Sequence, residues 1–434
     1  MHDLGSRGAS RLGWLFGIIV TIAVAGNLGC GGSASALGPT PTPNPSPSPI
    51  PTPTPTPAPL PAGTIGLKVL DTSVPPGGIF QWQLSNTEPK PIGHGSTRPQ
   101  VPPGTVRGVA VNDPSGHAAG IALVAPSGIS IQLTSPDNLL GTNVTYPVVT
   151  MSMPLSTSLT PGTTSTIGID TASTSLFQDA TTKYTTLEFA SGTLTIAPAG
   201  SPYVSDVIPG GGLLPDRTAI RILGANFDAN TRVSIEGTTI VPADQALVNS
   251  SEIDVKICNG TVADGVATCP NNGTSFQLDG ERVRVKNQST NFVNEYYSYP
   301  RAQDAAGTSK NTLVTEVHPM FSRQTYLAAT IALVNSGTQF TGLALQNTSG
   351  TDDGIKIELL DANGASLNPA ATLSFILPAG NKIARDVIQD WFGGSVPAGA
   401  AKVKMTVTSG NVPVQAVGML GDTGAGTVAP VLPQ

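Results

Sequence analysis

Alternating apolar and charged residues constrain this chain more strongly than any other feature. Ile253, Val255 and Ile257 stand at every second position, with charged residues between them. Val283 and Val285 repeat the pattern between basic residues. Successive side chains of a β-strand point to opposite faces, so this period predicts half-buried strands with one solvated face.

The composition extends this prediction to the rest of the chain. Glycine and proline number 49 and 39 of 434 residues, and only 12% of residues are charged. Such a composition favours many short strands joined by turns and argues against a helical or α/β enzyme. The net charge is −6, and Lys and Arg are not clustered, so we do not expect nucleic acid as a partner.

The first 29 residues have the pattern of an export signal. Arg7 and Arg11 form a positively charged region, and the apolar run of residues 12–25 follows. This run has the length of a signal-peptide core and is short for a transmembrane helix. We therefore expect residues 1–29 to be a signal peptide.

The residues after the apolar run resemble the lipobox of bacterial lipoproteins. Leu28 and Gly29 precede Cys30, whereas Asn27 departs from the pattern, which usually has an aliphatic residue there. The resemblance implies lipidation of Cys30 and an anchor at the outer membrane or cell surface, because several acyl chains hold a protein stably on a bilayer. Cleavage after Ala36, which would give a secreted protein, and an uncleaved anchor remain open.

A proline-rich segment follows the predicted anchor. Every second residue from Pro39 to Pro61 is proline, twelve in all. Proline restricts both its own φ and the residue before it to extended geometry. At about 3.1 Å per residue, such a segment reaches roughly 70 Å. We expect residues 30–63 to be the lipidated cysteine and a semi-rigid linker.

The middle of the chain resembles the IPT/TIG domain, an immunoglobulin-like β-sandwich. The resemblance covers residues 201–299 and rests on Tyr203–Pro209, Thr218–Phe227, Thr231–Gly237 and Gly280–Asn287. It implies an immunoglobulin-like domain over residues 199–300, of a kind found in surface receptors, adhesins and carbohydrate-active proteins.

Two further β-rich modules flank this domain. Thr160–Asp170 and Ser191–Ile196 resemble the closing strands of a cohesin, which implies a β-sandwich over residues 64–198 that binds a protein or a glycan. Phe340–Asn347 resembles a C-terminal β-sandwich of bacterial surface proteins, which implies a third module over residues 312–434 after a polar linker, 301–311. The predicted fold class is all-β, with three tandem immunoglobulin-like sandwiches.

The third module also contains one helical pattern. Ile383, Val387, Ile388 and Trp391 fall at helical spacing, and two glycines follow. This spacing predicts a single short helix that crosses between sheets.

Beyond Cys30, the cysteines form an even pair. Cys258 and Cys269 in an exported chain predict a disulfide, which would close a twelve-residue loop and contribute about 3 kcal/mol. A zinc site is the alternative, but no histidine lies near either cysteine in the sequence.

Motifs for catalysis are absent from the sequence. The histidines are scattered without zinc-ligand spacing, and no G-x-S-x-G motif occurs. The carboxylate pairs Asp352/Asp353 and Asp386/Asp390 fit a solvated turn and the exposed face of the short helix. A calcium ion at Asp352/Asp353 or at Asp361/Asn363 remains open. We therefore expect no enzyme activity, no cofactor and no catalytic or metal site.

Tyrosines at the end of the immunoglobulin-like domain are the best candidates for ligand contact. Alternation would bury one face of the Tyr296, Tyr297 and Tyr299 segment and expose the other, and exposed rings can contact sugars. Overall, the sequence predicts a non-enzymatic, lipid-anchored surface protein for extracellular binding, adhesion or envelope structure. A polysaccharide-binding component of a carbohydrate-degradation system is the alternative.

The lipid anchor leads to a direct prediction. Replacing Cys30 by Ser removes the thiol that would be acylated, so a Cys30→Ser variant should lose fatty-acid labelling and partition into the aqueous phase. Metabolic labelling and detergent phase separation measure both properties. Labelling equal to that of the unchanged chain would contradict the lipoprotein interpretation.

Overall fold

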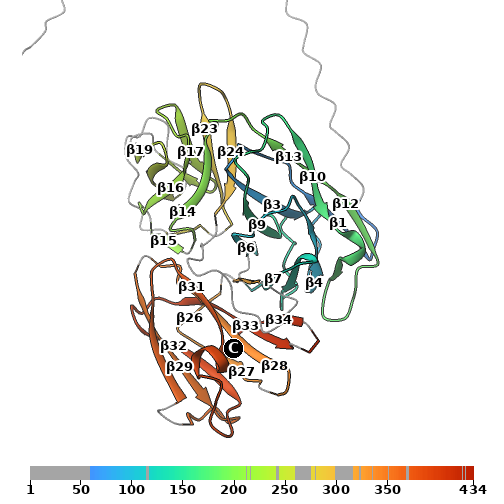
Figure 1. Cartoon of the computed structure of the whole chain (residues 1–434), viewed down its shortest axis with the longest axis vertical. Helices are drawn as coiled ribbons and strands as arrows, with labels where there is room; N and C mark the ends of the chain where they lie inside the picture. The colour runs from blue at the N-terminus through green and yellow to red at the C-terminus, as the bar shows by residue number, and fades with distance from the viewer. Residues whose placement is uncertain are drawn as a thin grey trace, which may run out of the picture. The chain divides into compact units, whose positions relative to one another are not determined.

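Strands make up nearly all of the regular structure in the computed structural model (Figure 1). They build three tandem β-sandwich modules, each with its own apolar core, as the sequence predicts. The structure describes residues 59–113, 117–211, 213–215, 217–240, 244–259, 275–278, 280–298, 316–321, 324–334, 336–349, 351–367, 371–422, 424–425 and 427–434.

The first module packs its sheets around Trp82. The sheets have the orders β12-β1-β3-β9-β6, β2-β13-β10-β5 and β11-β4-β8-β7-β25, and the pairs β1/β12 and β2/β13 are parallel. The buried Trp82 indole donates its Nε1–H to the carbonyl oxygen of Gly168 at 3.1 Å. The elements are β1 (Thr64–Val69), β2 (Thr72–Val74), β3 (Ile79–Asn86), β4 (His94–Thr97), β5 (Pro99–Gln100), β6 (Gly108–Val111), β7 (Ala119–Ala125), β8 (Gly128–Thr134), β9 (Val149–Pro154), β10 (Thr164–Ile169), η1 (Thr171–Ser173), β11 (Ser175–Phe177), β12 (Thr186–Ala190) and β13 (Gly192–Ile196).

The second module has the strand order of an immunoglobulin constant-type sandwich. One sheet runs β14-β16-β20-β19 and the other β17-β23-β24, which corresponds to the A-B-E-D and C-F-G sheets of that fold. The alternating Ile and Val residues of β20 and β23 face the shared core, as predicted. The strands are β14 (Tyr203–Ile208), β15 (Leu213–Pro215), β16 (Ala219–Ala225), β17 (Thr231–Ile235), β18 (Thr238–Thr239), β19 (Gln245–Asn249), β20 (Glu252–Lys256), β21 (Cys258–Asn259), β22 (Ser275–Gln277), β23 (Arg282–Asn287) and β24 (Val293–Tyr297).

The third module packs two sheets face to face. Their orders are β26-β33-β28-β31, with β34 also paired to β33, and β27-β32-β29-β30. The elements of the remaining chain are β25 (Glu316–Met320), β26 (Thr325–Tyr326), β27 (Ala328–Ala332), β28 (Gln339–Gln346), β29 (Asp353–Leu360), β30 (Thr372–Leu377), β31 (Lys382–Asp386), η4 (Val387–Trp391), β32 (Lys402–Ser409), β33 (Val414–Asp422) and β34 (Thr427–Val431).

The first and third modules share a strand and an apolar interface. Strand β25 lies in the range predicted for the third module, yet it pairs with β7 of the first, and Met320 is buried in the first core. On β7, Ile121 and Leu123 pack against Phe340 and Met419 of the third module. The three modules together therefore form one compact unit.

The predicted helix is shorter than expected. Ile383 lies in strand β31, and only Val387–Trp391 form a helical turn. Asp386 starts this turn because its carboxylate accepts the N–H groups of Ile388 and Gln389 at 2.9 and 2.8 Å. Asp386 is thus a buried cap, and the prediction that it faces solvent was wrong. Within the described ranges, no helix is long and apolar enough to cross a membrane.

Buried hydrogen bonds join the first and second modules. The Gln81 side chain donates from Nε2 to the carbonyl oxygen of Tyr297 at 2.9 Å and accepts its N–H at 2.6 Å. This pairing explains why β3 is buried along its whole length, although its sequence alternates apolar residues with glutamine. Gln81 therefore satisfies two backbone groups of β24 that water would otherwise contact.

A carboxyl group is buried in the third module. The sequence placed Asp352 and Asp353 in a solvated turn; Asp352 is exposed, whereas Asp353 is 0% exposed, so that prediction was wrong for Asp353. Gly410 covers it with a positive φ of 79°, and a Cβ atom there would lie 2.2 Å from Oδ1 of Asp353. Neither carboxyl oxygen accepts a hydrogen bond of good geometry from the described residues. Burial raises the pKa of Asp353, and the Asp352 carboxylate raises it further. The N–H of Val412 lowers this pKa, but by less than either of the other two effects raises it.

The Gln81 contact predicts a loss of stability on substitution. Gln81→Leu keeps the side-chain volume but leaves the buried N–H and C=O of Tyr297 without partners. Each such group costs about 1–3 kcal/mol, so we expect the free energy of unfolding to fall by about 2–6 kcal/mol. Urea denaturation of the variant and of the exposed Gln100→Leu control measures this. A loss equal to that of the control would contradict the proposed role of Gln81.

Asp353 predicts a pH dependence with a defined sign. A folded-state pKa above the unfolded value means that Asp353 stabilises the fold fully only below the unfolded pKa, about 4, and that this contribution is lost as pH rises through the folded pKa. An Asp353→Asn variant has no ionisable group at this position, so its stability does not fall with pH for this reason. Its free energy of unfolding should therefore increase relative to the unchanged chain as the pH rises above about 4. The exposed Glu188→Gln control should show no such trend, and an equal slope for both variants would refute the prediction.

Candidate functional site

The structure describes only part of the predicted cysteine chemistry. Cys258 is buried at the start of β21 and is disulfide-bonded. Its predicted partner Cys269 and the predicted lipidation site Cys30 lie outside the described residues. The pairing and the lipid anchor therefore stay predictions.

The tyrosines proposed as ligand contacts are not exposed. Tyr296 is 2% exposed and packs in the core of the second module, and Tyr297 is 4% exposed. The Tyr297 N–H is bonded to Gln81 of the first module, and burial raises the pKa of the Tyr297 hydroxyl. The exposure predicted for this segment was wrong for both residues, which removes the basis for a ligand contact there. Tyr299 lies outside the described residues.

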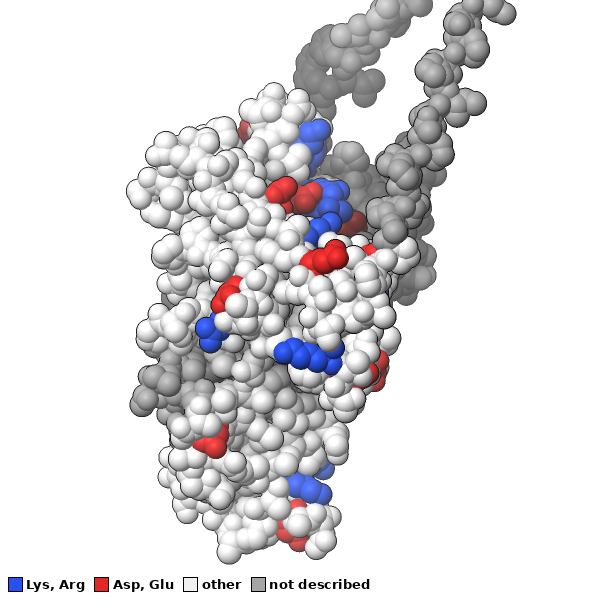
Figure 2. All heavy atoms as spheres, turned by 90° about the vertical axis from the view of Figure 1, so that its right-hand side faces the viewer, with Lys and Arg blue, Asp and Glu red and all other residues white. Residues whose placement is uncertain are grey.

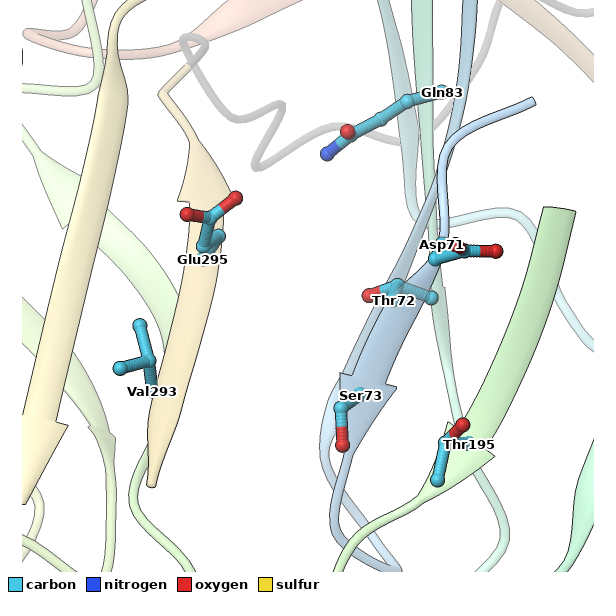
Figure 3. A pocket seen from close by; sticks show the side chains of 7 residues that line it. All are labelled: Asp71, Thr72, Ser73, Gln83, Thr195, Val293 and Glu295. Carbon is cyan, nitrogen blue, oxygen red and sulfur yellow. The ribbon is translucent and has the colours of Figure 1, made fainter. Parts of the chain in front are cut away.

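A polar pocket lies close to these tyrosines, at the junction of the first two modules. Its volume is about 300 Å³. Figure 3 shows that β24 forms one wall and that the segment entering β2, with the neighbouring β13, forms the other. Side chains of both modules line it: Asp71, Thr72, Ser73, Gln83, Thr195, Val293 and Glu295.

Hydrogen bonds hold the two walls together. Asn294, which is buried on β24, donates from Nδ2 to the carbonyl oxygen of Ser73 at 3.3 Å. The same side chain accepts the N–H of Val204 at 3.0 Å. Tyr203 adds a bond from its hydroxyl to the carbonyl oxygen of Gly77 at 3.3 Å. The pocket therefore has a defined shape although it spans two modules.

Each of the two carboxylates in the pocket has a partner outside it. Glu295 accepts the Nε–H of Arg284 at 2.6 Å and lies 3.6 Å from Arg282. Asp71 accepts the N–H of Thr193 at 2.8 Å, and in Figure 3 its carboxylate turns toward β13, away from Glu295. The two groups thus do not form a facing acid–base pair of the kind that glycoside hydrolysis uses. They are suited to accepting hydrogen bonds from a bound ligand.

An amide and hydroxyl groups complete the lining. Gln83 projects from β3 into the space between the walls (Figure 3), and its Nε2 lies 3.5 Å from Oε1 of Gln81. Thr72 and Thr195 come from the parallel strands β2 and β13. This combination of fixed acceptors and rotatable hydroxyl groups can bind a polar ligand in a defined orientation.

No sequence pattern indicated this pocket. Asp71 and Gln83 precede Glu295 by more than 200 residues, and the three belong to no local motif. The two walls meet only through the packing of two modules.

Other chemistry-bearing side chains remain apart. Among the described residues, no group of three or more His, Cys, Asp and Glu side chains could hold a metal ion. The His94 ring stacks on Phe177, whereas His117 contacts the Asp137 carboxylate. The structure therefore does not bring these two histidines to one site.

Comparison with known proteins gives fold-level similarity only. No protein-family model matches the chain, and no curated protein matches it. Among solved structures, it is similar to the third cohesin of ScaC from Acetivibrio cellulolyticus, solved with the ScaB dockerin, at 14% identity and a TM-score of 0.27. That match covers 31% of this chain and 99% of the cohesin chain. A non-cellulosomal cohesin from Archaeoglobus fulgidus matches at 11% identity and a TM-score of 0.26, over 31% of this chain and 92% of that one. Scores this low do not assign the chain to the cohesin family.

Proposed function

We propose that this chain is an exported, lipid-anchored binding protein without enzyme activity that acts at the outer membrane or cell surface. The signal-like N-terminus and Cys30 support export and anchoring. The proline-rich segment of residues 39–61 supports a spacer between the membrane and the modules. The three modules then present binding surfaces to extracellular protein or polysaccharide.

The junction pocket is the observation that carries this proposal. Its walls are joined by hydrogen bonds, and its lining offers carboxylate, amide and hydroxyl groups. Both carboxylates are committed to partners outside the pocket, so the arrangement supports recognition rather than proton transfer. Polar pockets between domains are common ligand sites.

The molecular surface agrees with an extracellular protein or polysaccharide as ligand. On the face shown in Figure 2, acidic and basic residues lie interspersed among broad uncharged regions. The chain carries 22 Lys and Arg against 28 Asp and Glu. Binding of nucleic acid depends on a concentrated positive field, which this face does not offer.

Filling the junction pocket should weaken binding of the ligand that this pocket holds. Val293 is 37% exposed at the pocket wall, so a Val293→Trp variant places a large ring in the space that the ligand would occupy. We expect at least a tenfold loss of capture when the full-length protein is tested against a polysaccharide panel and cell-envelope preparations. The class of ligand captured distinguishes polysaccharide binding from adhesion to a protein.

A matched control separates the effect of filling the pocket from a general effect of adding a tryptophan ring to the surface. Val248 is 53% exposed on β19, away from the pocket lining, so Val248→Trp adds the same ring elsewhere. This control should bind like the unchanged chain. Equal binding by both variants would remove the junction pocket as the site, and no saturable capture of any ligand would overturn the binding function.

A further inference from the structure

A second polar surface lies on the outer face of the first module. On β4, β8 and β11, the pairing register places alternate residues in two rows of three: His94 lies opposite Thr134 and Phe177, and Ser96 lies opposite Gln132 and Ser175. Alternate residues of a strand share one face. All six side chains are half-exposed, so they form one accessible array.

Aromatic rings form one end of this array. The His94 and Phe177 rings stack with centroids 4.2 Å apart and an angle of 15° between their planes. Gly95 permits this arrangement, because a Cβ atom there would lie 2.4 Å from the carbonyl oxygen of Ser175. The close approach of β4 and β11 therefore sets the position of the aromatic pair.

The third module closes the other side. Ala429 and Pro430 of β34, which packs against β7 and β8, face the array and leave a pocket of about 400 Å³. The result is a small apolar wall opposite an aromatic and hydroxyl-bearing floor. Such a site binds a ligand that has both C–H faces and hydroxyl groups.

The side chains that line the pocket favour an uncharged ligand. Lys, Arg, Asp and Glu are absent from the described residues that line the pocket. Ser96, Gln132, Thr134 and Ser175 make no side-chain hydrogen bond with any described residue, so their donors and acceptors are open to a ligand. Neutral sugars match this surface, because ring C–H groups pack on aromatic rings while their hydroxyls pair with hydroxyl and amide groups.

We infer that this pocket, bounded by β4, β8, β11 and β34, binds neutral sugar units of a polysaccharide. The inference rests on the proposed binding function and names a ligand class for it, but it uses a site separate from the junction pocket. The two sites share no lining residue.

Binding of neutral oligosaccharides tests the inference. Full-length protein is titrated calorimetrically with oligomers of glucose, mannose, xylose and N-acetylglucosamine, and with oligogalacturonate as a charged comparison. We expect saturable binding of at least one neutral oligomer, at least about tenfold weaker in Phe177→Ala and about fivefold weaker in Gln132→Ala, as loss of one hydrogen bond predicts. Phe292→Ala, which removes a half-buried ring outside the apolar cores, is the matched control.

Each other outcome overturns the inference in a distinguishable way. Circular dichroism and melting temperature establish whether each variant is folded. If Phe177→Ala does not fold, Gln132→Ala still tests the pocket, because this variant leaves the aromatic pair intact. Unchanged affinity in a folded Gln132→Ala variant, or binding of the charged oligomer alone, refutes the sugar site. Neutral binding that is lost only in Val293→Trp refutes this pocket while it supports the junction pocket. Capture of protein alone refutes the sugar site and leaves the proposed function standing.

Discussion

The reciprocal pair of hydrogen bonds between Gln81 and the backbone of Tyr297 is the contact on which the arrangement of the first two modules depends. Without it, β3 and β24 would bring buried polar groups together unpaired, at a cost of several kcal/mol. With it, the Gln81 side chain on β3 pairs directly with the backbone of β24. The junction pocket exists because Asn294 and Gln83 continue this hydrogen-bonded boundary toward the surface.

The contact between the first and third modules works differently. Ile121, Leu123, Phe340 and Met419 join them through apolar burial, which is nondirectional, and strand β25 adds backbone pairing that fixes the register. Both proposed binding sites lie at such boundaries. A protein built from similar sandwiches can thus obtain distinct ligand sites from the way its modules pack, while the modules themselves remain structural.

Sequence patterns predicted individual strands well and exposure less well. The alternation of Ile253 and Val255 correctly placed a half-buried strand, because one sheet face is enough to explain it. For the segment of Tyr296 and Tyr297, alternation predicted one exposed face, whereas both side chains are buried. Ile383 fitted a helical period by coincidence, because its strand runs directly into the turn that Asp386 caps.

The sequence by itself determined the all-β class, because this class depends on local periodicity and composition. Only the tertiary structure decided which polar residues would meet. Asp71 and Glu295, like His94 and Pro430, are brought together by contacts between modules, and such contacts leave no periodic trace along the chain. The burial of Asp353 likewise depends on the turn at Gly410, which lies 57 residues further along the chain.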